Sequence, residues 1–348
     1  MDVDFGGADD ILFERSGHAG IVTLNRPAAL NAVNHRMVRA LTRALAAWEA
    51  DAAVRLVVIR AEGRAFSAGG DILDIYEAGR AGDPPFDFFA DEYRLNAAIA
   101  RFPKPYVALI NGIVMGGGVG VSFHGSHRVM TGNAVFAMPE VGIGFFPDVG
   151  GSHFLSRLPG GFGLYLALTG NRIRHGDACA FGLATHSVPA DDLPALLRRL
   201  CETGDADASL AVDARAVAAE TEDAVMDAIA RHFAHDTLDG VLGSLAADGG
   251  EWANAMHATL MARSPTSLRV TFRQIRTGAT LTMDDCMRME FRILSRMLVG
   301  HDFYEGIRAA IIDKKSTPHW RPAALDAVAQ ADVDAYFAPP AGGDLSLQ

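Results

Sequence analysis

Short apolar runs, each closed by glycine and followed by the start of a helix, characterise the first half of the chain. "VRLVVIRAEG" and "KPYVALING" have the length and composition of buried strands. A strand, a glycine turn and a helix start occur in that order at residues 57–71 and again at 107–120. This loose repeat predicts strands stacked in a spiral with helices outside, a fold of the α/β class.

The N-terminal pattern predicts two further strands and one helix. "ILFERSGHAGIVTLNRP" indicates two strands around a Gly-His-Ala-Gly turn. The segment after it carries Met37, Leu41, Leu45 and Trp48 at helical spacing, and Asn34 is placed to cap the helix.

After about residue 191 the strand patterns almost vanish. "DLPALLRRLCE", "TEDAVMDAIARHFA" and "MRMEFRILSRMLVGHDFYEGIRAAIID" are typical of amphipathic helices. The Ala- and Asp-rich segment near residue 210 is expected to be an exposed connector. We therefore expect a mixed core followed by a helical extension.

Composition and charge exclude several classes of protein. The formal net charge of −11 argues against a nucleic-acid partner, which would require a basic face. The uncharged run at 105–127 is interrupted by Asn111, histidines and glycines, so no membrane span is expected. The three cysteines have no CxxC spacing, and the acidic N-terminus resembles neither a secretory signal nor a transit peptide. These features predict a cytoplasmic protein.

Two glycine turns, "FSAGGD" and "MGGGVG", could offer backbone N–H groups to an oxyanion. Each follows a strand and opens a helix, where the first amides have no partner within the helix. Two such amides facing one another would form an oxyanion hole, whereas the simpler interpretation is close packing of strand against helix. The sequence does not match other glycine-rich motifs. The dinucleotide-binding pattern GxGxxG fails because residue 121 is valine, and no P-loop or Gly-x-Ser-x-Gly nucleophile elbow is present. The histidine pairs lack a further ligand, so no metal site is assigned.

Glu140 and Asp148 lie in the apolar, glycine-rich stretch "FAMPEVGIGFFPDVGG". A carboxylate in such surroundings loses hydration unless its charge is used or paired. Two neighbouring carboxylates can hold different protonation states, one acting as a base or nucleophile and the other as its partner. The alternative is that each acid is paired with a backbone amide or with an arginine such as Arg128 or Arg157.

Several separated motifs together resemble the enoyl-CoA hydratase/isomerase (crotonase) superfamily. They are "FSAGGDI", "NGIVMGGGVGVS", "FAMPEVGIGFFPDVGG" and "LALTGNRI", and in the C-terminal half "RSPTSLRVTFRQIRTG" and "HDFYEGIRAAIIDKKSTPHWRPA". The resemblance covers roughly residues 10–338 and is strongest to the thioester hydrolases of that superfamily. It implies a spiral of strand–strand–helix repeats at 10–200. It also implies a helical extension at 201–348 that completes the site and mediates contacts in a homo-oligomer (dimer, trimer or hexamer).

The resemblance also implies roles for individual residues. Glu140 would be the main catalytic carboxylate and Asp148 its partner, while the backbone amides of Ala68 and Gly117 would bind the thioester oxygen. The residues expected to contact the acyl-CoA substrate are Glu92, Gly116, Asp71, Ile72 and Ala28.

The implied activity is hydrolysis of a short-chain 3-hydroxyacyl-CoA thioester, with 3-hydroxyisobutyryl-CoA of valine degradation as the expected substrate. No cofactor is expected, because coenzyme A is part of the substrate. Gly120 stands where hydratases of the superfamily carry a second glutamate, which disfavours a hydratase. A dienoyl-CoA isomerase remains an alternative, since those enzymes also have a Glu and an Asp at this spacing. A non-enzymatic alternative is a module that binds acyl-CoA without converting it.

Overall fold

The computed structural model describes residues 1–347 and divides the chain into two compact units. Each unit is assembled from three separate stretches of sequence, so the chain passes repeatedly from one unit to the other. Unit 1 comprises Met1–Asp71, Ala90–Phe136 and Ile173–Glu220, and unit 2 comprises Ile72–Phe89, Ala137–Arg172 and Thr221–Gln348.

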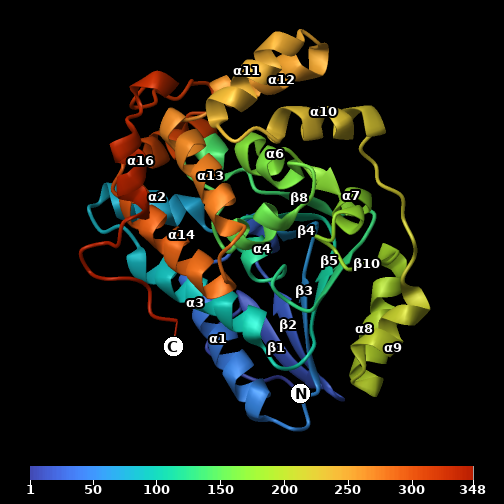
Figure 1. Cartoon of the computed structure of the whole chain (residues 1–348). Helices are drawn as coiled ribbons and strands as arrows, with labels where there is room; N and C mark the ends of the chain where they lie inside the picture. The colour runs from blue at the N-terminus through green and yellow to red at the C-terminus, as the bar shows by residue number, and fades with distance from the viewer. Residues whose placement is uncertain (348) are drawn as a thin grey trace. The chain divides into compact units, whose positions relative to one another are not determined.

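Unit 1 contains two sheets (Figure 1). In the six-stranded sheet only β1 and β2 pair in antiparallel fashion, and the other neighbours are parallel. Its strands, in spatial order, are β1 (Ile11–Ser16), β2 (Ala19–Leu24), β3 (Leu56–Ala61), β5 (Tyr106–Ile110), β7 (His127–Met130) and β10 (His186–Ser187). The four-stranded sheet has the order β4 (Ala65–Ser67), β6 (Ile113–Met115), β8 (Val135–Ala137) and β9 (Ile173–Arg174).

The repeat expected from the sequence is present, and each copy contains two strands. β3 and β4 precede helix α2 (Ile72–Arg80), and β5 and β6 precede the short helix α4 (Gly117–Gly120). The first strand of each copy joins the large sheet and the second joins the small one. Between the two strands the chain turns at Gly63 and Gly112, whose positive φ angles of 87° and 82° favour glycine. The α/β spiral of strand–strand–helix repeats is therefore confirmed.

Helices cover both faces of the large sheet. Trp48 of α1 (His35–Ala50) packs against Phe13 and Gly20, while the Asn34 side chain caps this helix by accepting from the Met37 amide at 2.9 Å. The opposite face is covered by α8 (Leu193–Thr203) and α9 (Ala206–Asp213), which Figure 1 shows side by side in yellow-green. Leu210 is part of that apolar cluster, so the expectation of an exposed connector near residue 210 is wrong for residues 206–213.

Unit 2 is mainly helical. Every residue of α6 (Phe162–Thr169) is buried, and α10, α12 and α13 all contact it. α2 also belongs to this unit. Its further α-helices are α5 (Gly151–Phe154), α10 (Asp223–Phe233), α11 (Leu238–Asp248), α12 (Glu251–Met261), α13 (Pro265–Gly278), α14 (Met283–Met297), α15 (His301–Ile307) and α16 (Gln330–Phe337).

The remaining elements are connecting helices and short turns. α3 (Phe86–Arg101) runs from a segment of unit 2 into a segment of unit 1, and α7 (His175–Ala180) lies in unit 1. The short 3₁₀-helices are η1 (Pro27–Ala29), η2 (Glu140–Ile143), η3 (Leu155–Arg157), η4 (Ala190–Asp192) and η6 (Leu325–Ala327), and η5 (Arg308–Ile312) is a π-helix.

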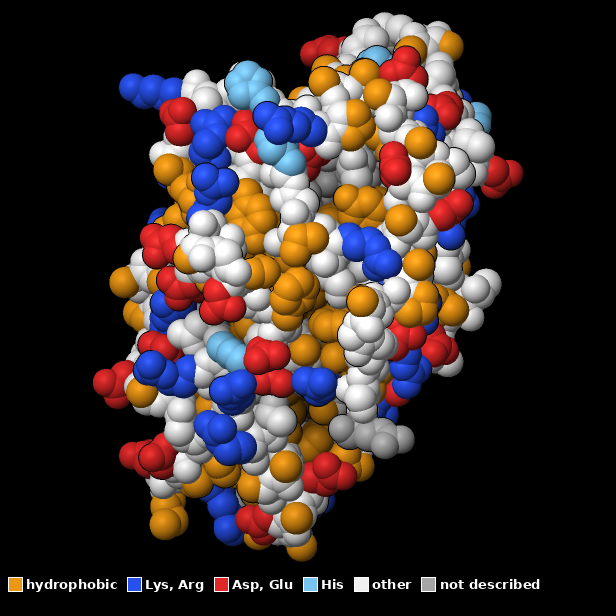
Figure 2. All heavy atoms as spheres, turned by 90° about the vertical axis from the view of Figure 1, so that its left-hand side faces the viewer, with side chains coloured by type: hydrophobic (Ala, Val, Ile, Leu, Met, Phe, Trp, Pro, Cys, Tyr) orange, Lys and Arg blue, Asp and Glu red, His pale blue; other side chains and the backbone are white. Residues whose placement is uncertain are grey.

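The division into units differs from the expected boundary at residue 200. Within the described residues all regular elements after β10 are helical, as expected, yet α8 and α9 belong to unit 1. None of the helices described at residues 1–347 has the length and apolar character needed to cross a bilayer. On the face shown in Figure 2, acidic and basic side chains are interspersed rather than gathered into one basic strip.

Candidate active site

The first glycine turn is held against the segment that precedes α1. Ala68 donates its N–H to Leu30 O at 3.0 Å, Val33 N–H bonds to Gly69 O at 2.8 Å, and Asp71 N–H bonds to Val33 O at 3.0 Å. These bonds use the Ala68 amide, which contradicts its expected role as an oxyanion donor. Of the four amides from Ala68 to Asp71, Gly70 N–H is the one without an acceptor in the described part of the chain.

Asn31 fixes the approach to this turn. Its side chain is buried, and its Nδ2 donates to the carbonyl oxygens of Glu62 and Ala65, each at 2.8 Å. The Asn31 backbone has φ 56°, a left-handed conformation that asparagine tolerates better than most residues. The strand β4 and the turn after it are thus anchored by a residue more than thirty positions upstream.

The second glycine turn meets the first. Gly117 opens α4, where the first amides of a helix have no intrahelical acceptor. A Cβ atom at Gly117 would lie 3.4 Å from Gly70 N and only 2.8 Å from Glu92 Oε1. A methyl group at Gly117 would therefore displace the Glu92 carboxylate and narrow the space beside the Gly70 amide. The structure brings together three of the regions singled out in the sequence.

The expected substrate contacts have different environments. Glu92 lies on α3 and is 2% exposed, and Gly116 is buried. Asp71 forms an ion pair with Arg26 at 2.8 Å. Ala28 is exposed in η1, and Ile72 is partly buried at the start of α2, in unit 2.

In unit 2, Glu140 is the first residue of η2 and is 7% exposed. Its Oε2 atom is buried without a hydrogen-bond partner among the described residues. Arg157, which the sequence offered as a partner, instead donates to the carbonyl oxygens of His153, Gly278 and Leu281. The interpretation in which Arg157 neutralises Glu140 does not fit this arrangement.

Three buried carboxylates influence one another in this unit: Glu140, Asp148 and Glu290. Burial raises the pKa of Glu140 well above its ordinary value, and the negative charges of Asp148 and Glu290 raise it further. Asp148 is 5% exposed and Glu290 is fully buried. A carboxyl with a raised pKa is suited to acid–base chemistry near neutral pH.

Glu290 was not singled out in the sequence. It lies on α14, where Oε2 accepts the Gly150 N–H at 2.8 Å and Oε1 accepts the Ser152 N–H at 2.9 Å. Burial raises its pKa to about 8, although the bonds from Ser152 and Gly150 act in the opposite direction. The sequence did contain a signal, because Glu290 interrupts an apolar row at helical spacing formed by Met287, Leu294 and Met297.

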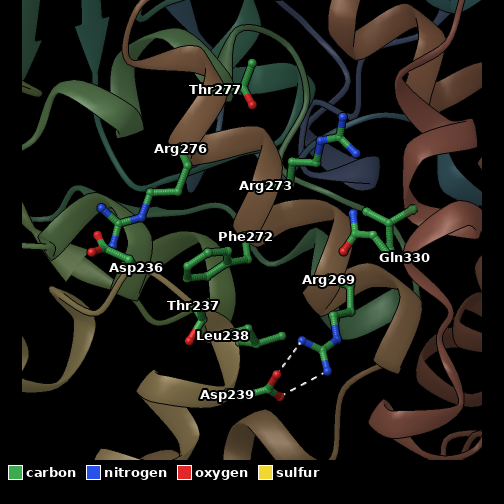
Figure 3. Close-up of a pocket in the computed structure, with 11 residues that line it drawn as sticks. Asp236, Thr237, Leu238, Asp239, Arg269, Phe272, Arg273, Arg276, Thr277 and Gln330 are labelled. Atoms are coloured by element: carbon green, nitrogen blue, oxygen red, sulfur yellow. Dashed lines mark hydrogen bonds and ion pairs between the residues drawn. The ribbon is translucent and has the colours of Figure 1, made fainter.

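A hollow of about 530 Å³ elsewhere in unit 2 contains none of the expected site residues (Figure 3). Arg269 forms two bonds of 3.0 Å with Asp239, Arg273 pairs with Asp334, and Arg276 donates to backbone oxygens. Because all three guanidinium groups are engaged, this cluster is explained by packing between helices. Its lining residues are Asp236, Thr237, Leu238, Asp239, Arg269, Phe272, Arg273, Arg276, Thr277, Gln330 and Val333.

Metal-binding geometry is not found in the described range. No group of three or more His, Cys, Asp or Glu side chains among residues 1–347 is arranged to hold a metal ion. The groups that could take part in a reaction are therefore backbone N–H donors in unit 1 and buried carboxylates in unit 2.

Comparison with known proteins identifies the class. Residues 19–337 match the family model described as enoyl-CoA hydratase/isomerase, and the chain belongs to this family. The chain is similar to "3-hydroxyisobutyryl-CoA hydrolase, mitochondrial" of Gallus gallus, with 44% identity over 98% of this chain and 91% of the relative. It is also similar to the protein of the same name from Xenopus tropicalis, with 43% identity over 97% of this chain and 91% of that relative. A solved structure described as a carnitinyl-CoA dehydratase, from Mycobacterium thermoresistibile, superposes with a TM-score of 0.93 at 43% identity, covering 98% of this chain and 99% of the other.

The comparisons correct one expectation. The sequence was interpreted as that of a cytoplasmic protein, but the relatives from Gallus gallus and Xenopus tropicalis are named mitochondrial. The prediction of a cytoplasmic location is therefore contradicted.

Proposed function

We propose that this chain hydrolyses a short-chain 3-hydroxyacyl-CoA thioester, with 3-hydroxyisobutyryl-CoA as its substrate. The relatives that share 43–44% identity over almost the whole chain carry the name of that hydrolase. The structural observation that supports the proposal is Glu140, a buried carboxylate with an unpartnered oxygen and a raised pKa.

Thioester hydrolysis passes through a tetrahedral oxyanion, and unit 1 has the donors to stabilise it. We assign this role to the amides of Gly117 and Gly70, the latter replacing Ala68, whose N–H is bonded to Leu30. A methyl group at Gly117 would lie 3.4 Å from Gly70 N, so both glycines border one space. Each such donor contributes on the order of 10²–10³ in rate.

We assign the role of the catalytic carboxylate to Glu140. Glu140 removes a proton from water as it adds to the thioester carbon, or attacks that carbon itself to give a mixed anhydride that water opens. In the first route the C–S bond breaks when the tetrahedral intermediate collapses, and in the second it breaks when the anhydride forms, before water opens it. In both routes CoA leaves as the thiolate, takes up a proton and is released as the thiol. Asp148 hydrogen-bonds the substrate's 3-hydroxyl or raises the pKa of Glu140, and no further cofactor takes part.

A hydratase or dehydratase is the second candidate, favoured by the name that the solved relative from Mycobacterium thermoresistibile carries. Addition of water to a double bond by two glutamates needs a side chain where this protein has Gly120, which is buried in α4. The absence of that carboxylate favours the hydrolase.

One assay separates the two candidates. With 3-hydroxyisobutyryl-CoA the hydrolase releases free thiol, whereas a hydratase or dehydratase changes the enoyl absorbance and releases none. Glu140→Gln keeps the shape of the side chain but removes the base, and should lower thiol release by about 10³-fold or more. Thiol release at the wild-type rate in this variant would remove Glu140 from the mechanism, and enoyl chemistry without thiol would favour the second candidate.

The helical region 201–348 is part of the proposal. It contributes Glu290 to the group of carboxylates around Glu140, which supports a role in completing the site. The expected homo-oligomer stays a prediction, which light scattering of the purified protein would test.

A further inference from the structure

The segment that carries Asp148 has an unfavourable backbone conformation. Val149, directly after Asp148, has φ 47°, and Gly150 has φ 89°. Glycine adopts such angles freely, but a β-branched valine in the left-handed region is strained. This conformation persists only if the surrounding structure holds it.

Two side chains from the C-terminal helices hold this segment. Glu290 of α14 accepts the N–H groups of Gly150 and Ser152, at 2.8 and 2.9 Å. Gln274 of α13 donates through Nε2 to Pro147 O at 2.6 Å and to Ser152 Oγ at 2.8 Å. Together they bind residues 147, 150 and 152 on both sides of Asp148.

Both polar side chains lie in the protein interior, where a polar side chain is unfavourable unless it forms hydrogen bonds. Glu290 and Gln274 are fully buried on the inner faces of their helices. Burial of a carboxyl or an amide is costly unless it makes hydrogen bonds, and these two bonds of Glu290 involve both of its oxygens. α13 also approaches the segment closely, since a Cβ at Gly278 would lie 2.2 Å from Ser152 O.

We propose that Glu290, assisted by Gln274, is a positioning residue that fixes the 147–152 segment so that Asp148 is held in its reactive orientation. This inference rests on the proposed function, because Asp148 matters only if it acts in the reaction. It extends that function by giving two helices of the C-terminal region a defined task in turnover. Glu290 contacts the backbone of the segment and not the reacting atoms.

The first experiment compares Glu290→Gln with wild type in the thiol-release assay. Glutamine provides one acceptor oxygen in place of two, so one of the two amides loses its partner while the side-chain volume is kept. We expect kcat to fall about 10- to 100-fold with KM within about twofold, as for misplacement of a catalytic group. Hydrogen exchange at the amides of residues 148–152 should become faster.

Asp177→Asn is the matched control. Asp177 is also a buried carboxylate that accepts a backbone amide, that of Glu220 at 2.8 Å, and it lies in unit 1. A structural role alone would predict equal losses in both variants. A kcat of Glu290→Gln within twofold of wild type, or equal to that of Asp177→Asn, would overturn the proposal.

Gln274→Leu provides a second test of the same inference, which can be carried out even if Glu290→Gln does not fold. It removes the second contact and leaves the carboxylate in place, so a smaller fall in kcat with unchanged KM is expected. An unchanged kcat in folded Gln274→Leu, where Glu290→Gln fails to fold, counts against the inference. Full activity in Glu140→Gln would instead refute the proposed function, and the two failures are therefore distinguishable.

Discussion

The glycine turns of unit 1 and the carboxylate group of unit 2 illustrate two ways of building a reactive site. In unit 1 the proposed functional atoms are backbone amides, and Gly117 leaves room for them because it has no side chain. In unit 2 the proposed functional atoms belong to side chains, and the segment that carries Asp148 is held by Glu290, 140 residues beyond Gly150. The first kind of site depends on local backbone geometry, and the second depends on distant helices.

Among the substitutions that distinguish these two kinds of site, Gly117→Ala should have the largest effect on the reaction rate. The new methyl group would lie 2.8 Å from Glu92 Oε1 and 3.4 Å from Gly70 N, in the space assigned to the oxyanion. We expect kcat/KM to fall about 10²–10³-fold in the thiol-release assay.

Gly243→Ala is the control for this substitution. No atom lies within 4 Å of a Cβ at Gly243, which is inside α11. Activity should be unchanged, and stability should rise by up to about 1 kcal/mol because alanine favours the helix. Equal activity in Gly117→Ala and Gly243→Ala would show that the Gly117 turn serves packing only.

Replacement of Asp148 by asparagine should give a smaller effect on rate and a diagnostic one on pH dependence. The negative charge of Asp148 raises the pKa of Glu140, so its removal should lower that pKa. The acid limb of the kcat/KM profile should therefore move to lower pH. We expect kcat itself to fall about 10- to 100-fold, since a hydrogen bond to a charged group contributes about 1.5–3 kcal/mol.

Asp302→Asn provides the comparison for Asp148. Asp302 is a buried carboxylate of the same unit that accepts from Ser264 Oγ at 2.6 Å and from the Arg321 amide at 2.7 Å. Its substitution should leave the acid limb in place. If the profile of Asp148→Asn coincides with that of wild type, the two carboxylates do not act on one another.

A further expected effect concerns stability rather than rate, and it involves Glu290. Its pKa is about 8 in the folded protein and about 4.5 ordinarily, so the folded state binds the proton more tightly. The stabilisation is complete below about pH 4.5 and is lost as the pH rises to about 8. Thermal melts should show wild type losing stability relative to Glu290→Gln over that range. A relative gain of wild type with rising pH would contradict the raised pKa.

Much of the fold and the two carboxylates of the candidate site could be predicted from local patterns, and the roles of these carboxylates stay predictions. A strand and a glycine turn lie within residues 57–71, the helix α2 starts directly afterwards at Ile72, and the spiral follows from the repeat. Glu140 and Asp148 were found because charged residues are conspicuous in a short apolar stretch. The segment near residue 210 was misjudged because alanine and aspartate conceal the few apolar positions, such as Leu210, that pack against the sheet.

Two features of the site depend on contacts between segments far apart in sequence. Ala68 and Gly70 are equivalent candidates in "SAGGD", and only the bond from Ala68 to Leu30 shows which amide is occupied. Glu290 was not singled out, although it is a charge within an apolar helical row, and such a pattern does not reveal the partner of the charge. The amides of Gly150 and Ser152 become its partners only through tertiary folding.

The alternation of the chain between its two units has a consequence for biosynthesis. Unit 1 lacks its third stretch until Glu220 has been made, and unit 2 lacks its third stretch until the C-terminal helices emerge. Domains that follow one another along a chain are completed one at a time on the ribosome. The growing polypeptide here cannot complete one unit before it starts the other. Unfinished chains would expose sheet and helix surfaces that need later segments as cover, which makes them natural clients of chaperones.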